Sequence, residues 1–202
     1  MSSRIAVLDY GSGNLHSVSR ALAHVGAEVA VTSDAHEVVA SDALLIPGVG
    51  HFGQCVRALR ASGLAAVATD YVATGRPVVG VCVGLQVLFA GSQEDAEPGL
   101  AVLPAMVERL PDTVRVPHIG WNTVRWQRPH PYVDGIPDGT HFYFVHSFAP
   151  PVDADTVGVT EHGVPFAAAV GRANVFATQF HPEKSGEAGL QLYENVVRAV
   201  AA

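Results

Sequence analysis

The sequence predicts an α/β fold: an open, mostly parallel sheet with helices on both faces, and a β-rich second half. Short β-prone runs alternate with helical patterns through the first half, as in a parallel sheet with crossover helices. The run PVVGV at Pro77–Val81 is apolar throughout, which is typical of a parallel strand covered on both faces. No internal repeat or linker interrupts the chain, so one domain spanning residues 1–202 is expected.

The first half supplies the elements of the parallel sheet. Its β-prone runs predict strands at Arg4–Leu8, Ala27–Val31, Asp42–Ile46 and Pro77–Val81. Apolar residues at helical spacing predict helices over Asn14–His24, after a cap at Ser33 or Asp34, within Gln54–Thr74, and over Val83–Phe89.

The second half begins with a polar loop, Gly91–Gly99, and is then rich in strand patterns. Strands are expected at Met106–Leu110, Asn122–Trp126, His141–Phe148 and Asp155–Thr160. The runs Pro165–Val170 and Asn174–Phe180 flank the turn GRA and predict a hairpin. An amphipathic helix over Gly186–Ala201 closes the chain.

Composition narrows the class of protein. The chain carries 12 Lys and Arg against 19 Asp and Glu, a net charge of -7, and shows no basic patch, so nucleic-acid binding is disfavoured. Its two cysteines are too few for a secreted disulfide framework, which favours the cytoplasm. No run approaches the roughly 20 apolar residues of a membrane helix, and the N-terminal segment is not typical of a signal peptide.

Cys82 stands in the pattern Gly80-Val81-Cys82-Val83-Gly84, between a predicted strand and a predicted helix. This pattern is typical of a nucleophile elbow, where small residues two positions on either side let strand and helix approach. The helix N-terminus favours a thiolate, and the Val83 N–H would point at an oxyanion. The alternative is that Cys82 is a buried small apolar residue, the usual fate of a free cysteine. Cys55, on an apolar helical pattern, is interpreted as packing.

The segment QFHPE at Gln179–Glu183 supplies a base and its partner. Pro182 disfavours a helical conformation at His181, and residues two apart in an extended chain face the same way. His181 and Glu183 are therefore expected to touch, completing a triad with Cys82. His141 and His146 lie five apart in a predicted strand, hence on opposite faces. No cysteine or histidine spacing indicates zinc, and no metal or cofactor is expected.

The segment GVGHFG at Gly48–Gly53 matches a dinucleotide-binding glycine pattern. Pro47 precedes its glycines, and the next predicted strand ends in Val81-Cys82 instead of an acidic residue. Dinucleotide binding is therefore disfavoured. Two alternatives stay open, a tight turn and a loop that presents backbone N–H groups to a negative charge.

These residues resemble a known family. Cys82, His181 and Glu183 in their motifs resemble the triad of class I glutamine amidotransferases. Five motifs spread over nearly the whole chain are similar to those of the glutaminase subunits of imidazole glycerol phosphate synthase, in histidine biosynthesis: DYGSGN, PGVGHFG, PHIGWN, FYFVHSF and QFHPEKSG. Phe148, where many members have tyrosine, and Val83, where leucine is common, depart mildly from the family.

The resemblance implies that glutamine binds near Gln86 and the backbone of Gly50, His146 and Ser147, and that Cys82 forms a thioester with it. The oxyanion donors would be the N–H of Val83 and that of Val49, after a peptide rearrangement, or of Gly50.

The resemblance also implies a partner, a cyclase subunit with a (βα)8-barrel fold, bound as a heterodimer and supplied with ammonia through a channel. Candidates for the face toward the partner are Asn14, Trp121, Tyr143 and Lys184. For Trp121, packing in the core stays open as an alternative. Other interpretations are a different triad amidotransferase, a stand-alone γ-glutamyl hydrolase, and a binding subunit without activity.

Overall fold

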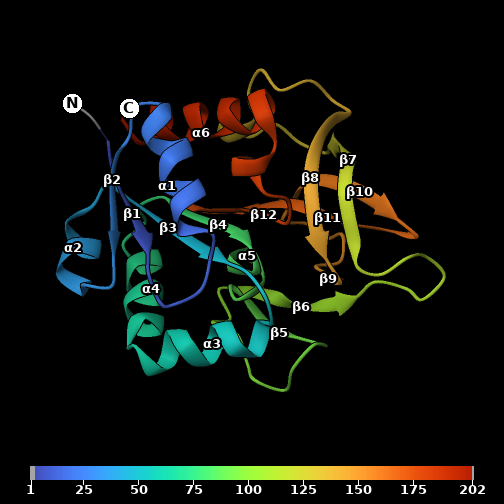
Figure 1. Cartoon of the computed structure of the whole chain (residues 1–202), viewed down its shortest axis with the longest axis horizontal. Coiled ribbons are helices and arrows are strands. Elements are labelled where there is room, and N and C mark those ends of the chain that lie inside the picture. The colour runs from blue at the N-terminus through green and yellow to red at the C-terminus, as the bar shows by residue number, and fades with distance from the viewer. Residues whose placement is uncertain (1–2, 202) are drawn as a thin grey trace.

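A nine-stranded sheet organises the computed structural model, which describes residues 3–201 (Figure 1). The strand order is β2-β1-β3-β4-β12-β11-β10-β7-β8. The first five strands of this order, β2, β1, β3, β4 and β12, run parallel to one another. From β12 onward each strand is antiparallel to the next. The bounds are β1 Arg4–Leu8, β2 Glu28–Thr32, β3 Ala43–Gly48, β4 Val78–Cys82, β7 His118–Trp126, β8 Thr140–His146, β10 Thr156–His162, β11 Val164–Arg172 and β12 Val175–Thr178.

Helices cover both faces of the parallel part of the sheet. Helices α1 and α6 pack together on one face, and α3 and α4 lie on the other (Figure 1). Their apolar stripes face strands β1, β3 and β4, whose residues are almost all buried. The helical bounds are α1 Leu15–His24, α2 Ala35–Ala40, α3 Phe52–Ala61, α4 Leu64–Ala73, α5 Val83–Gln86 and α6 Gly186–Val200, with 3-10 turns η1 Pro131–Val133 and η2 Pro182–Lys184. The predicted fold class is confirmed.

The helix predicted over Val83–Phe89 is wrong in its second half. Helix α5 ends at Gln86, and strand β5 follows at Phe89–Ser92, so the predicted loop from Gly91 is in part a strand. A short apolar run fits a helix and a strand equally well, and here the segment is a strand because it pairs with β6. Strand β5 runs parallel to β6 (Leu103–Arg109), and β9 (Phe148–Ala149) completes this small second sheet.

The strand predicted over His141–Phe148 is interrupted. Strand β8 ends at His146, the chain turns at Ser147, and Phe148 pairs with Arg109 of β6 in the small sheet. The Ser147 carbonyl accepts a hydrogen bond from the Leu110 N–H, which fixes this turn. Strand β7 is also longer than predicted, since it begins at His118.

The predicted hairpin around GRA is confirmed, since β11 and β12 pair antiparallel. Strand β12 lies between β11 and β4, and Thr178 is in register with Val81. The carboxyl ends of β4 and β12, which are distant in sequence, thus lie side by side. Cys82, the last residue of β4, and His181, shortly after β12, therefore enter one site. Within residues 3–201, no helix is long and apolar enough to cross a membrane.

Candidate active site

Cys82 occupies a strained turn between β4 and α5. Its backbone angles are φ 56° and ψ −114°, a conformation that residues other than glycine rarely adopt. A Cβ on Gly80 would lie 2.8 Å from the Gly84 carbonyl oxygen, and one on Gly84 would lie 1.9 Å from that of Ile46. Strand and helix meet too closely for any other residue at these two positions, as expected of a nucleophile elbow.

His181 and Glu183 meet behind Cys82. The His181 Nδ1 and Glu183 Oε1 atoms are 2.8 Å apart, and both side chains are almost fully buried. Their contact was predicted from an extended chain, but Glu183 lies in the 3-10 turn η2, which brings the carboxylate to the ring by a tighter path. The backbone N–H of His181 donates to the Tyr143 carbonyl, so strand β8 fixes the backbone that carries the ring.

The electrostatics of His181 follow from these neighbours. Burial lowers the pKa of His181, but the neighbouring Cys82 and Glu183 side chains outweigh burial and raise this pKa to about 10. The Nε2 atom is buried and makes no hydrogen bond to any described residue, so it stays available to a reacting group. A protonated ring beside Cys82 places a positive charge next to the sulfur, as in the sites of cysteine nucleophiles.

A cavity of about 640 Å³ opens in front of Cys82. Residues that the sequence placed in the site line it: Val49, Gly50, Cys82, Val83, Gln86, His146, Ser147 and His181. Two of the predicted interface residues, Asn14 and Lys184, also line the cavity, whereas Glu183 does not and contacts the His181 ring. The volume suits a small ligand such as an amino acid.

The segment Val49–Gly50, which follows strand β3, lines the cavity beside Cys82, since Gly48 is in register with Cys82. Its Val49 carbonyl accepts from Ser12 Oγ at 3.0 Å and from Cys55 Sγ at 3.4 Å. The Val49 N–H points at Ser12 Oγ, 3.5 Å away, and not at the cavity. Cys55 is buried as predicted, and it also holds this loop. A backbone rearrangement at Val49 is needed before its N–H can face Cys82.

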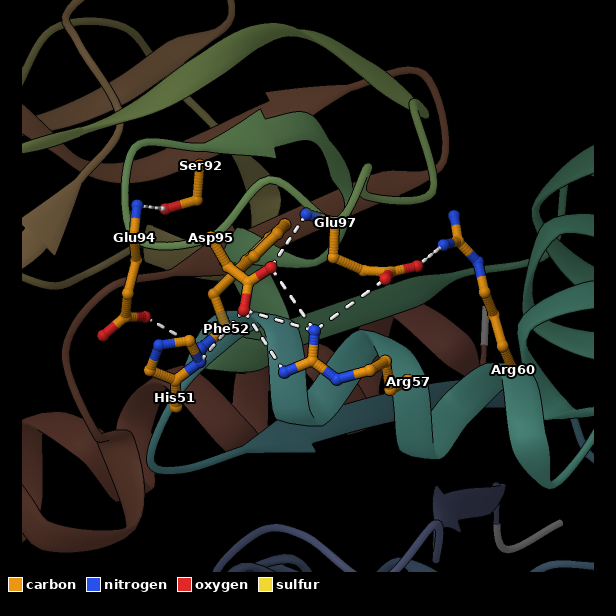
Figure 2. Close-up of polar contacts among 8 residues, drawn as sticks. All are labelled: His51, Phe52, Arg57, Arg60, Ser92, Glu94, Asp95 and Glu97. Atoms are coloured by element: carbon orange, nitrogen blue, oxygen red, sulfur yellow. Dashed lines mark hydrogen bonds and ion pairs between the residues drawn. The ribbon is translucent and has the colours of Figure 1, made fainter.

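Glu94, which no sequence pattern indicated, also lines the cavity. Its Oε2 accepts from the Phe52 N–H at the start of α3, 2.8 Å away, while Oε1 bonds to no other residue in 3–201. Asp95 and Glu97, in the same loop, bind Arg57 and Arg60 of α3 (Figure 2). This loop is therefore fastened to the helix, and Glu94 is held at the cavity. Its position between polar residues lacked any periodicity that could have singled it out.

The histidines separate as expected. His141 is exposed and His146 is buried, on opposite faces of β8. Burial, and then the neighbouring His118, lower the pKa of His146 to about 3, so it stays neutral. No cluster of three or more potential ligands in the described part of the chain could hold a metal ion.

The predicted interface residues gather beside the cavity. Trp121 is 56% exposed, which excludes core packing for it, and its ring meets that of Tyr143 edge-on at 6.2 Å between centroids. The Lys184 Nζ lies 5.8 Å from the centroid of the Tyr143 ring. Ile119, 61% exposed, lies on the same face of β7 two residues before Trp121. These four side chains form an apolar strip with one cation, and it borders the cavity.

Comparison with known proteins decides the family. The family model described as "Glutamine amidotransferase class-I" matches residues 6–200 of the chain. The chain belongs to the class-I glutamine amidotransferases. Proteins described as imidazole glycerol phosphate synthase subunit HisH resemble this amidotransferase along nearly its whole length. That of Dechloromonas aromatica is 50% identical over 96% of this chain and 95% of its own, and that of Thermobifida fusca is 46% identical over 98% and 99%.

Solved structures share the fold of this amidotransferase at much lower identity. PurLQS from Thermotoga maritima has a TM-score of 0.78 and 18% identity, over 98% of this chain and 99% of the other. The glutaminase domain of Trypanosoma brucei CTPS, solved with bound acivicin, has a TM-score of 0.67 and 19% identity, over 99% and 94%. At these identities the likeness concerns the fold alone.

Proposed function

We propose that the chain is the glutaminase subunit of imidazole glycerol phosphate synthase in histidine biosynthesis, acting in the cytoplasm as one domain. It hydrolyses glutamine to glutamate and ammonia, and the cyclase subunit uses the ammonia to form imidazole glycerol phosphate and an aminoimidazole carboxamide ribotide. The observation that carries the proposal is Cys82 on a strained elbow, beside the His181–Glu183 pair and open to a cavity of amino-acid size. The names of its relatives support the pathway.

The reaction uses the three residues in sequence. The Cys82 thiolate attacks the side-chain amide carbon of glutamine, and His181 donates its proton to the nitrogen, which leaves as ammonia. A thioester remains. The neutral His181 then takes a proton from water, whose oxygen attacks the thioester, and glutamate leaves as the thiol re-forms. Glu183 holds the ring through Nδ1, so that Nε2 carries the reacting proton.

The oxyanion requires two backbone donors. The Val83 N–H, at the first turn of α5, is one of them. The second is the N–H of Val49 or Gly50, and the Val49 N–H points at Ser12 in this structure. One such donor contributes about 3 kcal/mol to the transition state. Glutamine hydrolysis stays slow until the loop rearranges, which prevents release of ammonia without an acceptor.

The substrate's own charges account for two further contacts. The α-ammonium group of glutamine requires an anion, and Glu94 is the acidic residue that lines the cavity. Lys184, which also lines the cavity, is a cation that could bind the α-carboxylate or contact the partner. The carboxamide then extends toward Cys82, next to Gln86 and the backbone of His146 and Ser147.

The partner docks on the strip beside the cavity. Ile119, Trp121 and Tyr143 expose apolar surface with Lys184 adjacent, and exposed aromatic residues are the usual anchors of protein interfaces. We propose a heterodimer with a cyclase of (βα)8-barrel fold, which would cover this strip and, near Asn14, the mouth of the cavity. Ammonia would then pass from Cys82 to the barrel without entering solvent.

Glutamate release tests the function. The purified chain should release glutamate slowly alone, and at least about 100-fold faster with the cyclase subunit and its ribulosyl aminoimidazole substrate, as an added oxyanion donor requires. Cys82→Ala should abolish this release but leave synthesis from added ammonium salts intact. Fast release without any partner would instead indicate a stand-alone hydrolase. Loss of both activities in Cys82→Ala would make Cys82 structural.

A further inference from the structure

The carbonyl oxygen of Phe148 accepts two side-chain hydrogen bonds next to the active site. One comes from Gln86 Nε2 and the other from His146 Nδ1, each at 2.9 Å. A carbonyl can only accept, so both partners must present an N–H to it. The amide of Gln86 and the tautomer of His146 are thereby fixed. His146 carries its proton on Nδ1 and leaves Nε2 as an acceptor.

The fixed amide of Gln86 determines the orientation of Gln179. The second proton on Gln86 Nε2 is donated to Gln179 Oε1 at 3.0 Å. The amide nitrogen of Gln179 therefore faces the other way, and its N–H points at Cys82 Sγ, 3.8 Å away. Reversal of the Gln179 amide would place two NH₂ groups against each other. The side chains of Gln86, Gln179 and Cys82 are all buried.

A second branch holds His146 in place. His118 Nδ1 lies 3.1 Å from His146 Nε2, and Asn122 Nδ2 lies 3.2 Å from His118 Nε2. Asn122 Nδ2 also donates to the Glu161 carbonyl at 3.0 Å. The hydrogen bonds from Asn122 to His118 and from His118 to His146 lead from strand β7 to the Phe148 carbonyl that orients Gln86, and the other Asn122 bond anchors the chain of bonds to Glu161.

A buried amide is costly unless it bonds, and a side chain that only fills the core needs none. We propose that Gln179 is a further catalytic residue, whose amide N–H donates a hydrogen bond to Cys82 and stabilises its thiolate. Gln86 and Phe148 are the positioning groups that fix the direction of this bond. The inference deepens the proposed function, on which its catalytic meaning rests, since the thiolate is the nucleophile that attacks glutamine.

Other groups also act on Cys82, and the test must leave them unchanged. His181 lies beside it, and Tyr10 and Cys55 are close enough for electrostatic coupling. Glu94, His146 and Lys184 line the same cavity. Replacement of Gln179 keeps all six of these side chains, so a change in Cys82 reactivity reports the amide itself.

The experiment is alkylation of Cys82 by iodoacetamide in the full chain, followed against pH by mass spectrometry of the peptide that contains it. Gln179→Met keeps the length and removes the donor, whereas Gln179→Glu keeps the shape and replaces the donor with a negative oxygen. A hydrogen bond to a buried charge corresponds to about one to two pH units. The pH midpoint should rise by roughly one unit or more in Gln179→Met, and it should rise further in Gln179→Glu.

Gln127→Glu is the matched control, at an exposed position outside the cavity. Its midpoint should equal that of the wild type. A folded Gln179→Met with an unchanged midpoint would overturn the inference, even if partner-stimulated glutaminase activity is intact. Absence of that activity in the wild type would overturn only the proposed function, since alkylation does not depend on it.

The wild type provides a readout that needs no variant. The side-chain amide resonances of Gln179 should shift with pH across the same midpoint as alkylation, and this shift should vanish in Cys82→Ala. If the Gln179 variants do not fold, this measurement decides. If the Gln179 amide resonances do not change as Cys82 ionises, the hydrogen bond is refuted.

Discussion

The backbone of α5 lies so close to strand β3 that one methyl group at Gly84 would force them apart. A Cβ there would stand 1.9 Å from the Ile46 carbonyl oxygen, whereas real Cβ atoms essentially never approach closer than 3.0 Å. The gap must open by at least 1.1 Å. The obstacle is backbone in the centre of the sheet, which cannot turn away as a flexible side chain could. We therefore expect Gly84→Ala to move the elbow that carries Cys82.

The cost is estimated from known overpacking. Forcing extra carbon into a packed core costs typically 1–3 kcal/mol, and backbone against backbone belongs at the upper end, about 3 kcal/mol. For a chain of this size that loss lowers the unfolding temperature by roughly 6–12 °C. A displacement of about 1 Å at a reacting group costs about 100-fold in rate. Partner-stimulated kcat/KM for glutamine should fall by at least that factor.

Thermal unfolding and glutamate release check the two effects separately. The control is Gly75→Ala, where a Cβ meets nothing within 4 Å but φ is +78°. Backbone strain should cost it about 1–2 kcal/mol while its activity stays that of the wild type. A Gly84→Ala variant as stable and as active as the wild type would refute the argument that glycine is required for the elbow.

Three further predictions concern the triad, the buried histidines and the partner face. Glu183→Gln should lower stimulated kcat at least about 100-fold, since His181 loses the group that orients its tautomer, and steady-state kinetics measure it. Burial lowers the pKa of His118 from 6.5 to about 4, so the unfolded chain binds a proton that the folded chain does not. The unfolding free energy should therefore fall as pH drops from 6.5 to 4. Urea titrations at several pH values should show that it falls less with pH in His118→Phe than in the wild type. The same pH dependence in both proteins would contradict this prediction. Trp121→Ala should weaken cyclase binding about 30-fold by calorimetry with an unchanged unfolding temperature, because Trp121 is exposed, and unchanged affinity would exclude it from the interface.

Local patterns were enough to predict much of the fold and the centre of the site. The elbow at Cys82 and the His181–Glu183 contact depend on a few neighbouring residues, so their signals are contained in short segments. The hairpin of β11 and β12 follows from one turn. These features could be predicted because sequence proximity brings their parts together.

The rest depends on contacts that no local pattern carries. Gln86 and Gln179 are 93 residues apart, and only the folded sheet shows that their amides meet. Strand β5 exists because Phe89 pairs with Leu103, although its sequence suits a helix equally well. Glu94 reaches the cavity because its loop is fastened to α3 by ion pairs, which sequence periodicity does not report.

Strand β12 has a consequence for the order in which the protein can mature. It is the last strand of the chain, yet it lies in the interior of the sheet, between β4 and β11. A chain interrupted before Val175 lacks the strand that joins the two halves, and also lacks His181. During synthesis, Cys82 is made roughly a hundred residues before its base. Growing or truncated chains therefore carry the thiol without the base that activates it, and they do not hydrolyse glutamine until β12 has joined the sheet.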